Sequence, residues 1–243
     1  MLKIVPLFFL ACAAACRDLI LHGNATLGYY YVNVQIGTPP QTKSLILDTG
    51  SHQTILPCEG CTNCRDHLNS IFQTSQSSTF SFVDPAKTYL GWKCENGRVA
   101  GKCPFQQGYT EGSSYSGYFG TDVFKFESER ESDSVRNYNH VFGCAMKETG
   151  EFYTQEVDGI IGIGVLNPLE YSLPPTIIDT EILEGRIPRS HFAICVAHNG
   201  GRMRFGKTND HLHLPRVLPL TLDSSRMNWG SQYNVELQGI SVG

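Results

Sequence analysis

Residues 44–51 of the 243-residue chain read SLILDTGS, an apolar run followed by an acid, two hydroxyl residues and a glycine. The first four residues predict a short buried strand. Asp48 then stands where the strand leaves the core, where a buried charge is costly unless neighbours hydrogen-bond it. Thr49, Ser51 and the amides around Gly50 can supply those bonds, and Gly50 lets the backbone approach the acid closely. The pattern is typical of a carboxylate used for proton transfer, although an ordinary turn acid after a strand has the same sequence features.

The stretch immediately upstream decides between these two interpretations. Residues 31–41 read YVNVQIGTPPQ, and apolar and polar residues alternate from Tyr30 to Ile36, as in a half-buried strand. Together the two stretches resemble the first active-site segment of the pepsin-like aspartic proteases, in which one strand ends in Ile-Gly-Thr-Pro and the next carries Asp-Thr-Gly-Ser. The resemblance implies that Asp48 is a catalytic acid, supported by the three residues that follow it.

The composition limits the classes of protein to which the chain can belong. Hydrophobic residues make up 41% of the chain and charged residues 17%, which is typical of a globular protein. The 24 glycines and 12 prolines, with many aromatic and β-branched residues, favour an all-β fold with frequent turns. The net charge of -4 gives no reason to expect a nucleic-acid partner. The length suits one large domain or two small ones.

The N-terminus has the features of a signal peptide over residues 1–16. Lys3 supplies the positive charge, 4–10 the apolar stretch and 11–16 the small residues before cleavage. The apolar stretch is too short to span a membrane, and we expect no other membrane segment in the chain. The protein is therefore expected to enter the secretory pathway, to be secreted or to reside in an acidic or endomembrane compartment. Asn24-Ala25-Thr26 is then either a glycosylation site or an unused sequon.

Nine cysteines belong to this oxidising context, and seven of them lie beyond the signal peptide. From residue 57 the sequence becomes a polar, cysteine-rich insertion that extends to residue 104. Cysteines at such spacing, followed by His67, are typical either of a zinc site or of disulfides, and the secretory context favours disulfides. An odd count leaves one cysteine over, for which Cys195 is the candidate. The disulfide candidates are Cys58, Cys61, Cys64, Cys94, Cys103 and Cys144.

A second functional element is predicted at 109–123, which reads YTEGSSYSGYFGTDV. Glycines and serines at its tip, flanked by aromatic and β-branched residues, predict an exposed β-hairpin. The segment resembles the flap of pepsin-like proteases, in which a tyrosine opens a Tyr-x-x-Gly-Ser tip. The resemblance implies that Tyr109, Thr110, Glu111 and Gly112 contact substrate. The alternative is an ordinary hairpin with a packing tyrosine.

Further elements follow from local patterns. Residues 140–144 predict a short strand, and DGIIGIG at 158–164 predicts a glycine-punctuated strand that another backbone can approach closely. In the family, such a segment threads beside the strand that carries the catalytic acid. A short helix is expected within 176–186, and a hairpin around Asn-Gly-Gly at 199–201. Alternation at 233–242 predicts another strand.

The resemblance spans nearly the whole mature chain and is strongest to the subgroup that contains plasmepsin V and nepenthesin. Members of this subgroup carry a cysteine-rich insertion soon after Asp-Thr-Gly-Ser. Two departures are Thr110, where plasmepsin V has an unpaired cysteine, and Ile55, where pepsins commonly have tryptophan. The resemblance implies an N-terminal lobe over 17–205. It also implies that 206–243 is the interlobe connection and the start of an incomplete C-terminal lobe.

One catalytic acid is missing from the sequence if this resemblance holds. The family uses two aspartates, one from each lobe, which share a proton and activate a water for attack on the peptide bond. This chain has one Asp-Thr-Gly, and Asp223-Ser224-Ser225 lacks the glycine of a second motif. We therefore expect an aspartic endopeptidase that needs no metal and no cofactor, acts on a polypeptide as a monomer, and is inactive as this chain alone.

Two other interpretations stay open at this point. The chain could be a catalytically inactive relative that binds polypeptides in the same cleft. It could also form a homodimer in which each copy supplies one aspartate, although the chain is about twice too long for such a subunit.

Overall fold

The computed structural model describes residues 17–95, 97–127, 138–164 and 173–206, together with Tyr233 and Gly239. Strands dominate these residues, so the predicted all-β class is confirmed. The expected signal peptide and Asp223-Ser224-Ser225 lie outside the described residues, as does most of the strand expected at 233–242. Within the described ranges, no helix has both the length and the apolar character needed to cross a bilayer.

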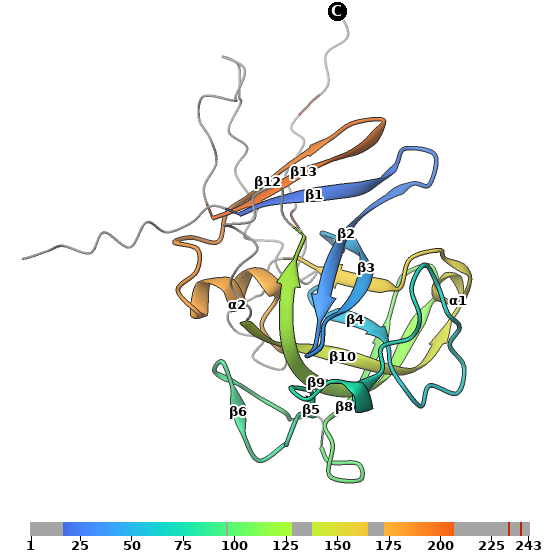
Figure 1. The fold of residues 1–243 in the computed structure, drawn as a ribbon, viewed down its shortest axis with the longest axis vertical. Helices are drawn as coiled ribbons and strands as arrows, with labels where there is room; N and C mark the ends of the chain where they lie inside the picture. The colour runs from blue at the N-terminus through green and yellow to red at the C-terminus, as the bar shows by residue number, and fades with distance from the viewer. Residues whose placement is uncertain are drawn as a thin grey trace, which may run out of the picture.

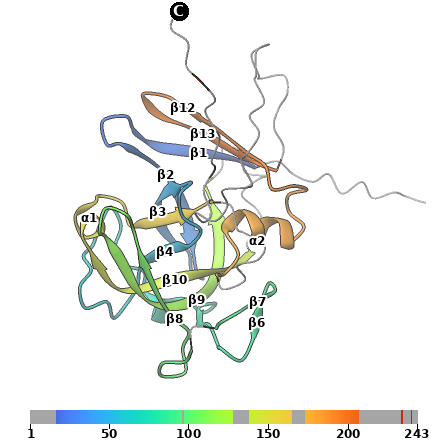
Figure 2. The ribbon, with the colours of Figure 1, turned by 180° about the vertical axis from the view of Figure 1, so that it is seen from behind.

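The elements can be followed along the ribbon in Figures 1 and 2. The helical segments are η1 (Thr74–Gln76), α1 (Glu151–Thr154) and α2 (Ile177–Leu183). The strands are β1 (Arg17–Asn24), β2 (Tyr29–Ile36), β3 (Gln41–Asp48), β4 (Thr54–Pro57), β5 (Ser81–Phe82), β6 (Thr88–Tyr89), β7 (Trp92–Lys93), β8 (Pro104–Gly108), β9 (Ser114–Phe126), β10 (Tyr138–Thr149), β11 (Gly159–Gly162), β12 (Phe192–Val196) and β13 (Asn199–Phe205).

Six strands of the main sheet close on themselves. Their order is β2-β3-β11-β4-β10-β9, and β9 pairs back onto β2, where Val34 lies opposite Phe126. Closure leaves these strands without a free edge. Strands β12, β13 and β1 continue the sheet beyond β2 as a separate layer, seen at the top of Figure 1. The sheet therefore encloses a core and extends one arm away from it.

The alternation predicted for residues 30–36 corresponds to β2. Val32, Val34 and Ile36 are buried in the core, and the intervening residues are more exposed. Strand β1 has the same pattern, with Leu19 and Leu21 buried, but the sequence analysis did not predict it. It pairs with β13 from the far end of the described chain, so its partner is about 180 residues away in sequence.

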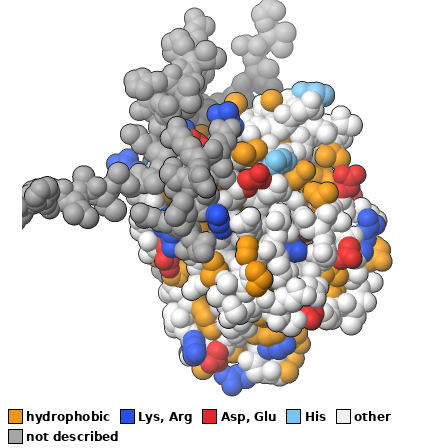
Figure 3. Space-filling model, viewed as in Figure 1, with side chains coloured by type: hydrophobic (Ala, Val, Ile, Leu, Met, Phe, Trp, Pro, Cys, Tyr) orange, Lys and Arg blue, Asp and Glu red, His pale blue; other side chains and the backbone are white. Residues whose placement is uncertain are grey.

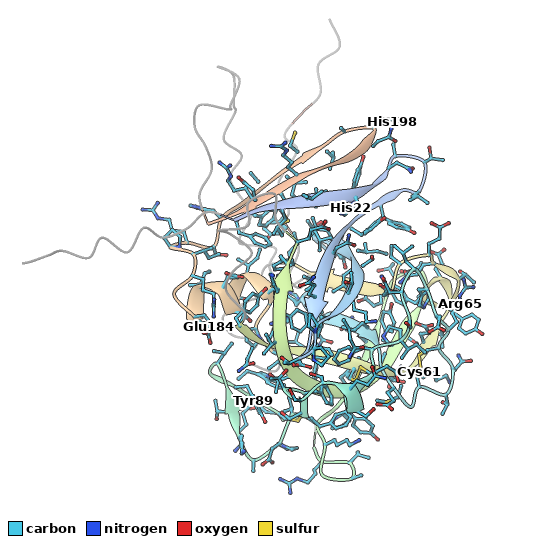
Figure 4. All side chains as sticks on the ribbon, in the orientation of Figure 1. His22, Cys61, Arg65, Tyr89, Glu184 and His198 are labelled. Atoms are coloured by element: carbon cyan, nitrogen blue, oxygen red, sulfur yellow. A yellow bond between two sulfur atoms is a disulfide. The ribbon has the colours of Figure 1, made fainter. Side chains whose placement is uncertain are left out.

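The cysteine-rich insertion is confirmed as a disulfide-stapled segment. Disulfides join Cys58 to Cys144, Cys61 to Cys64 and Cys94 to Cys103, so the sulfur atoms that a zinc site would need are bonded to one another. The insertion also contains short regular elements, η1, β5, β6 and β7, and it buries Phe72 and Trp92. Figure 4 shows Cys61 and Arg65 together on one side of the molecule.

Buried polar groups hold the insertion against the sheet. The His67 side chain is 2% exposed and that of Glu148 on β10 is fully buried, and His67 Nε2 lies 3.1 Å from Glu148 Oε1. His67 Nδ1 donates to the carbonyl of Gln155 at 2.8 Å. Since both ring nitrogens face oxygen acceptors, the site favours the doubly protonated ring. Zinc ligation was the alternative role for His67, and the structure instead gives it an ion pair.

A second buried charge network lies at the beginning of β3. Asp158 accepts hydrogen bonds from the Ser44 amide at 2.6 Å and from the Asn69 amide at 2.8 Å. The Lys43 ammonium donates to the Ser70 carbonyl. Burial lowers the pKa of Lys43, and the Asp158 and Asp66 charges oppose that shift. Charged groups thus join β3, the insertion and the residue before β11.

The remaining local predictions are largely confirmed. Helix α2 begins after Thr176, which forms a capping box with Asp179. The hairpin of β12 and β13 is present, but Asn199-Gly200-Gly201 begins β13 instead of forming the loop. A Cβ at Gly201 would meet the Cys195 carbonyl oxygen at 2.3 Å. The glycine therefore allows β12 and β13 to pack closely together at this point. On the face shown in Figure 3, acidic and basic side chains are interspersed, as the small net charge suggests.

The two disulfides that close loops of very different length should differ in their effect on stability. Cys58 and Cys144 are 86 residues apart, whereas Cys61 and Cys64 are three apart. Loop-closure entropy assigns about 4–5 kcal/mol to the first bond and about 1–2 kcal/mol to the second. We expect urea unfolding to show a much larger loss of stability for Cys58→Ala/Cys144→Ala than for Cys61→Ala/Cys64→Ala. Equal losses would contradict this account.

Acid should destabilise the fold through His140. This ring is fully buried against Phe124, donates through Nδ1 to Thr180 Oγ1 at 2.9 Å and accepts from Thr54 Oγ1 at 3.1 Å. Burial lowers the pKa of His140 to about 3, below the unfolded value of about 6.5. The unfolded chain therefore binds the proton first, and stability is lost as pH falls below about 6.5.

The loss between about pH 7 and about pH 5 is about 2 kcal/mol. We expect His140→Gln, which keeps hydrogen-bonding groups without titrating, to have a pH dependence of unfolding smaller by that amount. Denaturant unfolding of both proteins at the two pH values measures it. An unchanged pH dependence in the variant would show that His140 does not titrate in this way.

Candidate active site

Asp48 is the last residue of β3 and is half-buried. Its Oδ1 accepts a hydrogen bond of 2.8 Å from the amide of Gly50. Its backbone carbonyl accepts from the Ile163 amide, also at 2.8 Å. The carboxylate is therefore fixed by the turn that follows it, and its backbone is fixed by the chain leaving β11.

Strand β11 passes between β3 and β4, as the glycine pattern at 158–164 predicted. It runs parallel to β3, with Gly162 opposite Asp48, and antiparallel to β4, with Ile160 opposite Ile55. A Cβ at Gly162 would meet the backbone of Ser51 and His52 at 2.4–2.6 Å. Only glycine allows this approach, so β11 packs directly against the turn that carries the acid.

The three residues after Asp48 do not contribute equally to holding its carboxylate, although the sequence suggested that all three would. Gly50 supplies the hydrogen bond, and a Cβ there would lie 3.2 Å from Asp48 Oδ1, which confirms the expected close approach. Thr49 is exposed. Ser51 is 7% exposed, and its hydroxyl has no hydrogen-bond partner in the described part of the chain. The Ser51 hydroxyl is thus buried beside the acid and available to a further group.

The hairpin predicted at 109–123 is present, with β8 and β9 as its strands. Its tip spans 109–113, where Tyr109 donates its amide to the Ser113 carbonyl at 2.9 Å. Gly112 has φ +95°, a conformation that favours glycine at this turn. Thr110, Glu111 and Gly112 are exposed at the tip, whereas the ring of Tyr109 turns into the protein.

Tyr109 lies close to the acid. Its hydroxyl is buried without a hydrogen-bond partner among the described residues. Burial raises the pKa of Tyr109, the Ser51 hydroxyl opposes the rise, and the Asp48 and Glu111 charges add to it. The Ser51 hydroxyl and the Asp48 charge thus both act on the Tyr109 hydroxyl, so groups from two separate segments set its electrostatic surroundings.

An aromatic cluster that the sequence analysis missed holds the flap tyrosine. Phe152 of α1 packs edge-on against Tyr109 at 4.7 Å between ring centroids and stacks on Tyr115 at 4.2 Å. The Glu151 amide donates to the Ser113 hydroxyl at 2.9 Å, which ties α1 to the flap tip. No periodic pattern marks Phe152, because α1 is only four residues long. Its role depends on the spatial proximity of α1 and the flap.

The described residues contain no group of three or more histidine, cysteine, aspartate or glutamate side chains able to hold a metal ion. A single half-buried carboxylate with neighbouring neutral hydroxyls can accept a proton from water. A second carboxylate nearby would let the two share one proton.

Comparison with known proteins finds matches over most of this chain. A family model described as "Xylanase inhibitor N-terminal" matches residues 30–207. Aspartic protease 5 of Toxoplasma gondii is 34% identical over 203 residues, covering 76% of this chain and 20% of that protein. Plasmepsin V of Plasmodium falciparum isolate 3D7 is 31% identical over 213 residues, covering 86% of this chain and 35% of that protein.

A plant protein gives a similar result. Aspartic proteinase nepenthesin-2 of Nepenthes gracilis is 32% identical over 225 residues, covering 89% of this chain and 45% of that protein. The chain thus spans between about a fifth and under a half of the length of these three relatives.

The close packing of β11 predicts that Gly162 cannot be enlarged. Gly162→Ala would place a methyl group within 2.7 Å of three backbone atoms, and backbone cannot rotate away as a side chain can. We expect a loss of about 3 kcal/mol or more in unfolding free energy, or failure to fold. Gly108→Ala is the control, because a Cβ there meets nothing within 4 Å. Equal stability of the two variants would contradict the packing argument.

Proposed function

The chain belongs to the pepsin-like aspartic proteases, within the subgroup of plasmepsin V and nepenthesin, and from that premise we propose that it forms the N-terminal lobe of an aspartic endopeptidase. Asp48 is the catalytic acid that this lobe contributes. The observation that carries the proposal is the Asp48 carboxylate, oriented by the Gly50 amide and lying close to the buried hydroxyls of Ser51 and Tyr109.

The reaction follows from two carboxylates placed together. Two such groups cannot both ionise cheaply, so the pair holds one proton and titrates as a unit. The ionised member removes a proton from a water, which attacks the peptide carbonyl. The protonated member donates a hydrogen bond to the carbonyl oxygen as negative charge develops there. No step uses a metal, a cofactor or a covalent intermediate.

The flap supplies the substrate contacts in this proposal. An extended polypeptide would lie in the cleft like an added strand, with Thr110, Glu111 and Gly112 exposed towards it. The packing of Tyr109 on Phe152 would hold the flap tip in place. Closure of the hairpin would exclude water from the reacting bond.

The second carboxylate is expected from sequence beyond Gly243, since the chain carries one Asp-Thr-Gly. The contacts of Tyr233 support this expectation. Its hydroxyl donates to the Ile163 carbonyl at 2.8 Å, and its ring meets Phe192 at 5.4 Å. Ile163 in turn donates its amide to the Asp48 carbonyl. The Tyr233 side chain thus contacts the residue whose amide holds the Asp48 carbonyl.

The disulfides fit an oxidising compartment, and we propose that residues 1–16 direct the chain into the secretory pathway. We further propose that the protein is a monomer that binds a polypeptide and does not bind nucleic acid. Cys195 is exposed and free among the described cysteines, so it is available to bridge a C-terminal lobe.

Polypeptide binding without cleavage is the second candidate function. It is favoured by the name of the matched family, which describes an inhibitor, and by the single acid in this sequence. A homodimer with one acid from each copy is the third. Peptidase measurements on this chain and on its C-terminally extended form separate all three.

We expect the extended protein to cleave polypeptides at acidic pH, with inhibition by a pepstatin-type compound. Asp48→Asn should reduce kcat/KM by at least about a hundredfold, because the carboxylate can no longer accept a proton. Glu95→Gln, which changes an exposed acid of the same lobe, should retain activity. The chain ending at Gly243 should be inactive.

Other outcomes decide between the alternatives. Activity of the chain ending at Gly243 that is lost in Asp48→Asn would establish the homodimer. An extended protein that binds pepstatin or peptide but does not cleave would support the inactive relative. Unchanged activity in Asp48→Asn would overturn the role of Asp48 altogether.

A further inference from the structure

The turn between β1 and β2 carries a sequence motif that the proteolytic function leaves unexplained. Asn24-Ala25-Thr26 is the only Asn-x-Ser/Thr triplet in the 243 residues. Asn24 is the last residue of β1, and the four residues that follow it are exposed, with Leu27 at 37%. Gly28, with φ +78°, completes the turn into β2. The motif is therefore presented at the tip of a hairpin.

The Asn24 side chain has a defined conformation at this tip. Its Oδ1 accepts hydrogen bonds from the amides of Thr26 and Leu27, both at 2.9 Å. This is an Asx turn, in which the side-chain carbonyl replaces a backbone acceptor. Both bonds use the oxygen, and within the described ranges no hydrogen bond involves Nδ2. The amide nitrogen, which is the atom that a glycosyl group would join, is left available.

The turn explains Asn24 but not Thr26. Thr26 contributes only its backbone amide to the turn, and its exposed hydroxyl makes no hydrogen bond to any described residue. If the triplet were not glycosylated, the turn would therefore accept almost any residue at position 26. Glycosylation, in contrast, requires a hydroxyl residue at this position of the triplet.

The surroundings fit an attached glycan. The turn lies beside the tip of the β12–β13 hairpin, where the Ala25 amide donates to the His198 carbonyl at 3.2 Å. Tyr30 fixes the same hairpin by donating to the Ala197 carbonyl at 2.6 Å. Figure 4 labels His198 at this end of the molecule. The turn is held from the inner side by these bonds, while its outer residues remain exposed.

We propose that Asn24 is an N-glycosylation site of this protein. Asn24 Nδ2 bonds to the anomeric carbon of the first N-acetylhexosamine of a polyprenyl-pyrophosphate-linked oligosaccharide. The bond from that carbon to the pyrophosphate oxygen breaks, polyprenyl pyrophosphate leaves, and the amide nitrogen loses one proton. Oδ1 is not consumed, so both hydrogen bonds of the turn persist in the product. The proposal rests on the secretory route proposed above and is independent of proteolysis.

The test compares substitutions that separate the turn from the motif. The protein is expressed with its own N-terminus in a eukaryotic secretory host, and the peptide that contains Asn24 is analysed by mass spectrometry before and after peptide-N-glycosidase treatment. We expect a glycopeptide whose treatment converts Asn24 to aspartate and increases gel mobility. Thr26→Ser should keep the glycan, and Thr26→Ala should lose it completely. Both keep the backbone amide of the turn.

Measuring whether the cysteines are bonded in the same samples shows which of the two proposals, the glycosylation site or the secretory route, each result tests. Unmodified Asn24 in protein whose Cys58–Cys144 bond is formed would overturn the glycosylation site alone. Unmodified Asn24 in protein with reduced cysteines would overturn the secretory route and this proposal with it, while leaving peptidase activity to be judged separately. A glycan retained in Thr26→Ala would also contradict the proposal, because it would lie on another residue.

Discussion

The passage of β11 between β3 and β4 is the constraint on which the rest of the structure depends. One strand pairs with both neighbours, and its two terminal glycines let its backbone approach that of β4 and of the turn before β4. The amide of Ile163 then holds the carbonyl of Asp48, and the amide of Gly164 holds that of Ser51 at 2.8 Å. The acid is positioned by main-chain bonds from a strand more than 100 residues away in sequence. The backbone position of Asp48 is therefore a property of the barrel, while the Gly50 amide of the local turn orients its carboxylate.

Much of this arrangement can be predicted from sequence because glycine and apolar patterns have few explanations. The runs around Asp48, Tyr109 and Gly159 each imply a strand or hairpin, and their order along the chain implies the family. Two features could not be predicted. Strand β1 has the same alternation as β2, but its pairing with β13, about 180 residues away, cannot be predicted from local alternation. The packing of Phe152 on Tyr109 depends on where α1 and the flap meet in space.

The cysteine-rich insertion shows why residue type alone did not distinguish metal ligand from ion pair. Cys58, Cys61, Cys64 and His67 have a spacing that suits either chemistry. Glu148 decides the outcome, because a fully buried carboxylate requires a cationic or hydrogen-bonding partner and His67 supplies it. Glu148 lies more than 80 residues further along the chain. The disulfide from Cys58 to Cys144 joins the same two segments, so a covalent bond and an ion pair act on one contact.

Two buried histidines, His67 and His140, respond to acid in opposite directions, which bears on how such a fold tolerates acid. Burial opposes protonation of His67, but hydrogen bonds to Glu148 and to the Gln155 carbonyl, with the Glu148 and Asp158 charges, outweigh it and raise its pKa. The stabilisation from a raised pKa is fully present below the unfolded value of about 6.5 and is lost as pH rises through the folded value. His140, without a charged partner among its hydrogen bonds, has the reverse dependence. Acidification therefore keeps the insertion fixed to β10 while it weakens the packing of β10 against α2. These two contacts therefore make opposing contributions to the stability of the fold in acid.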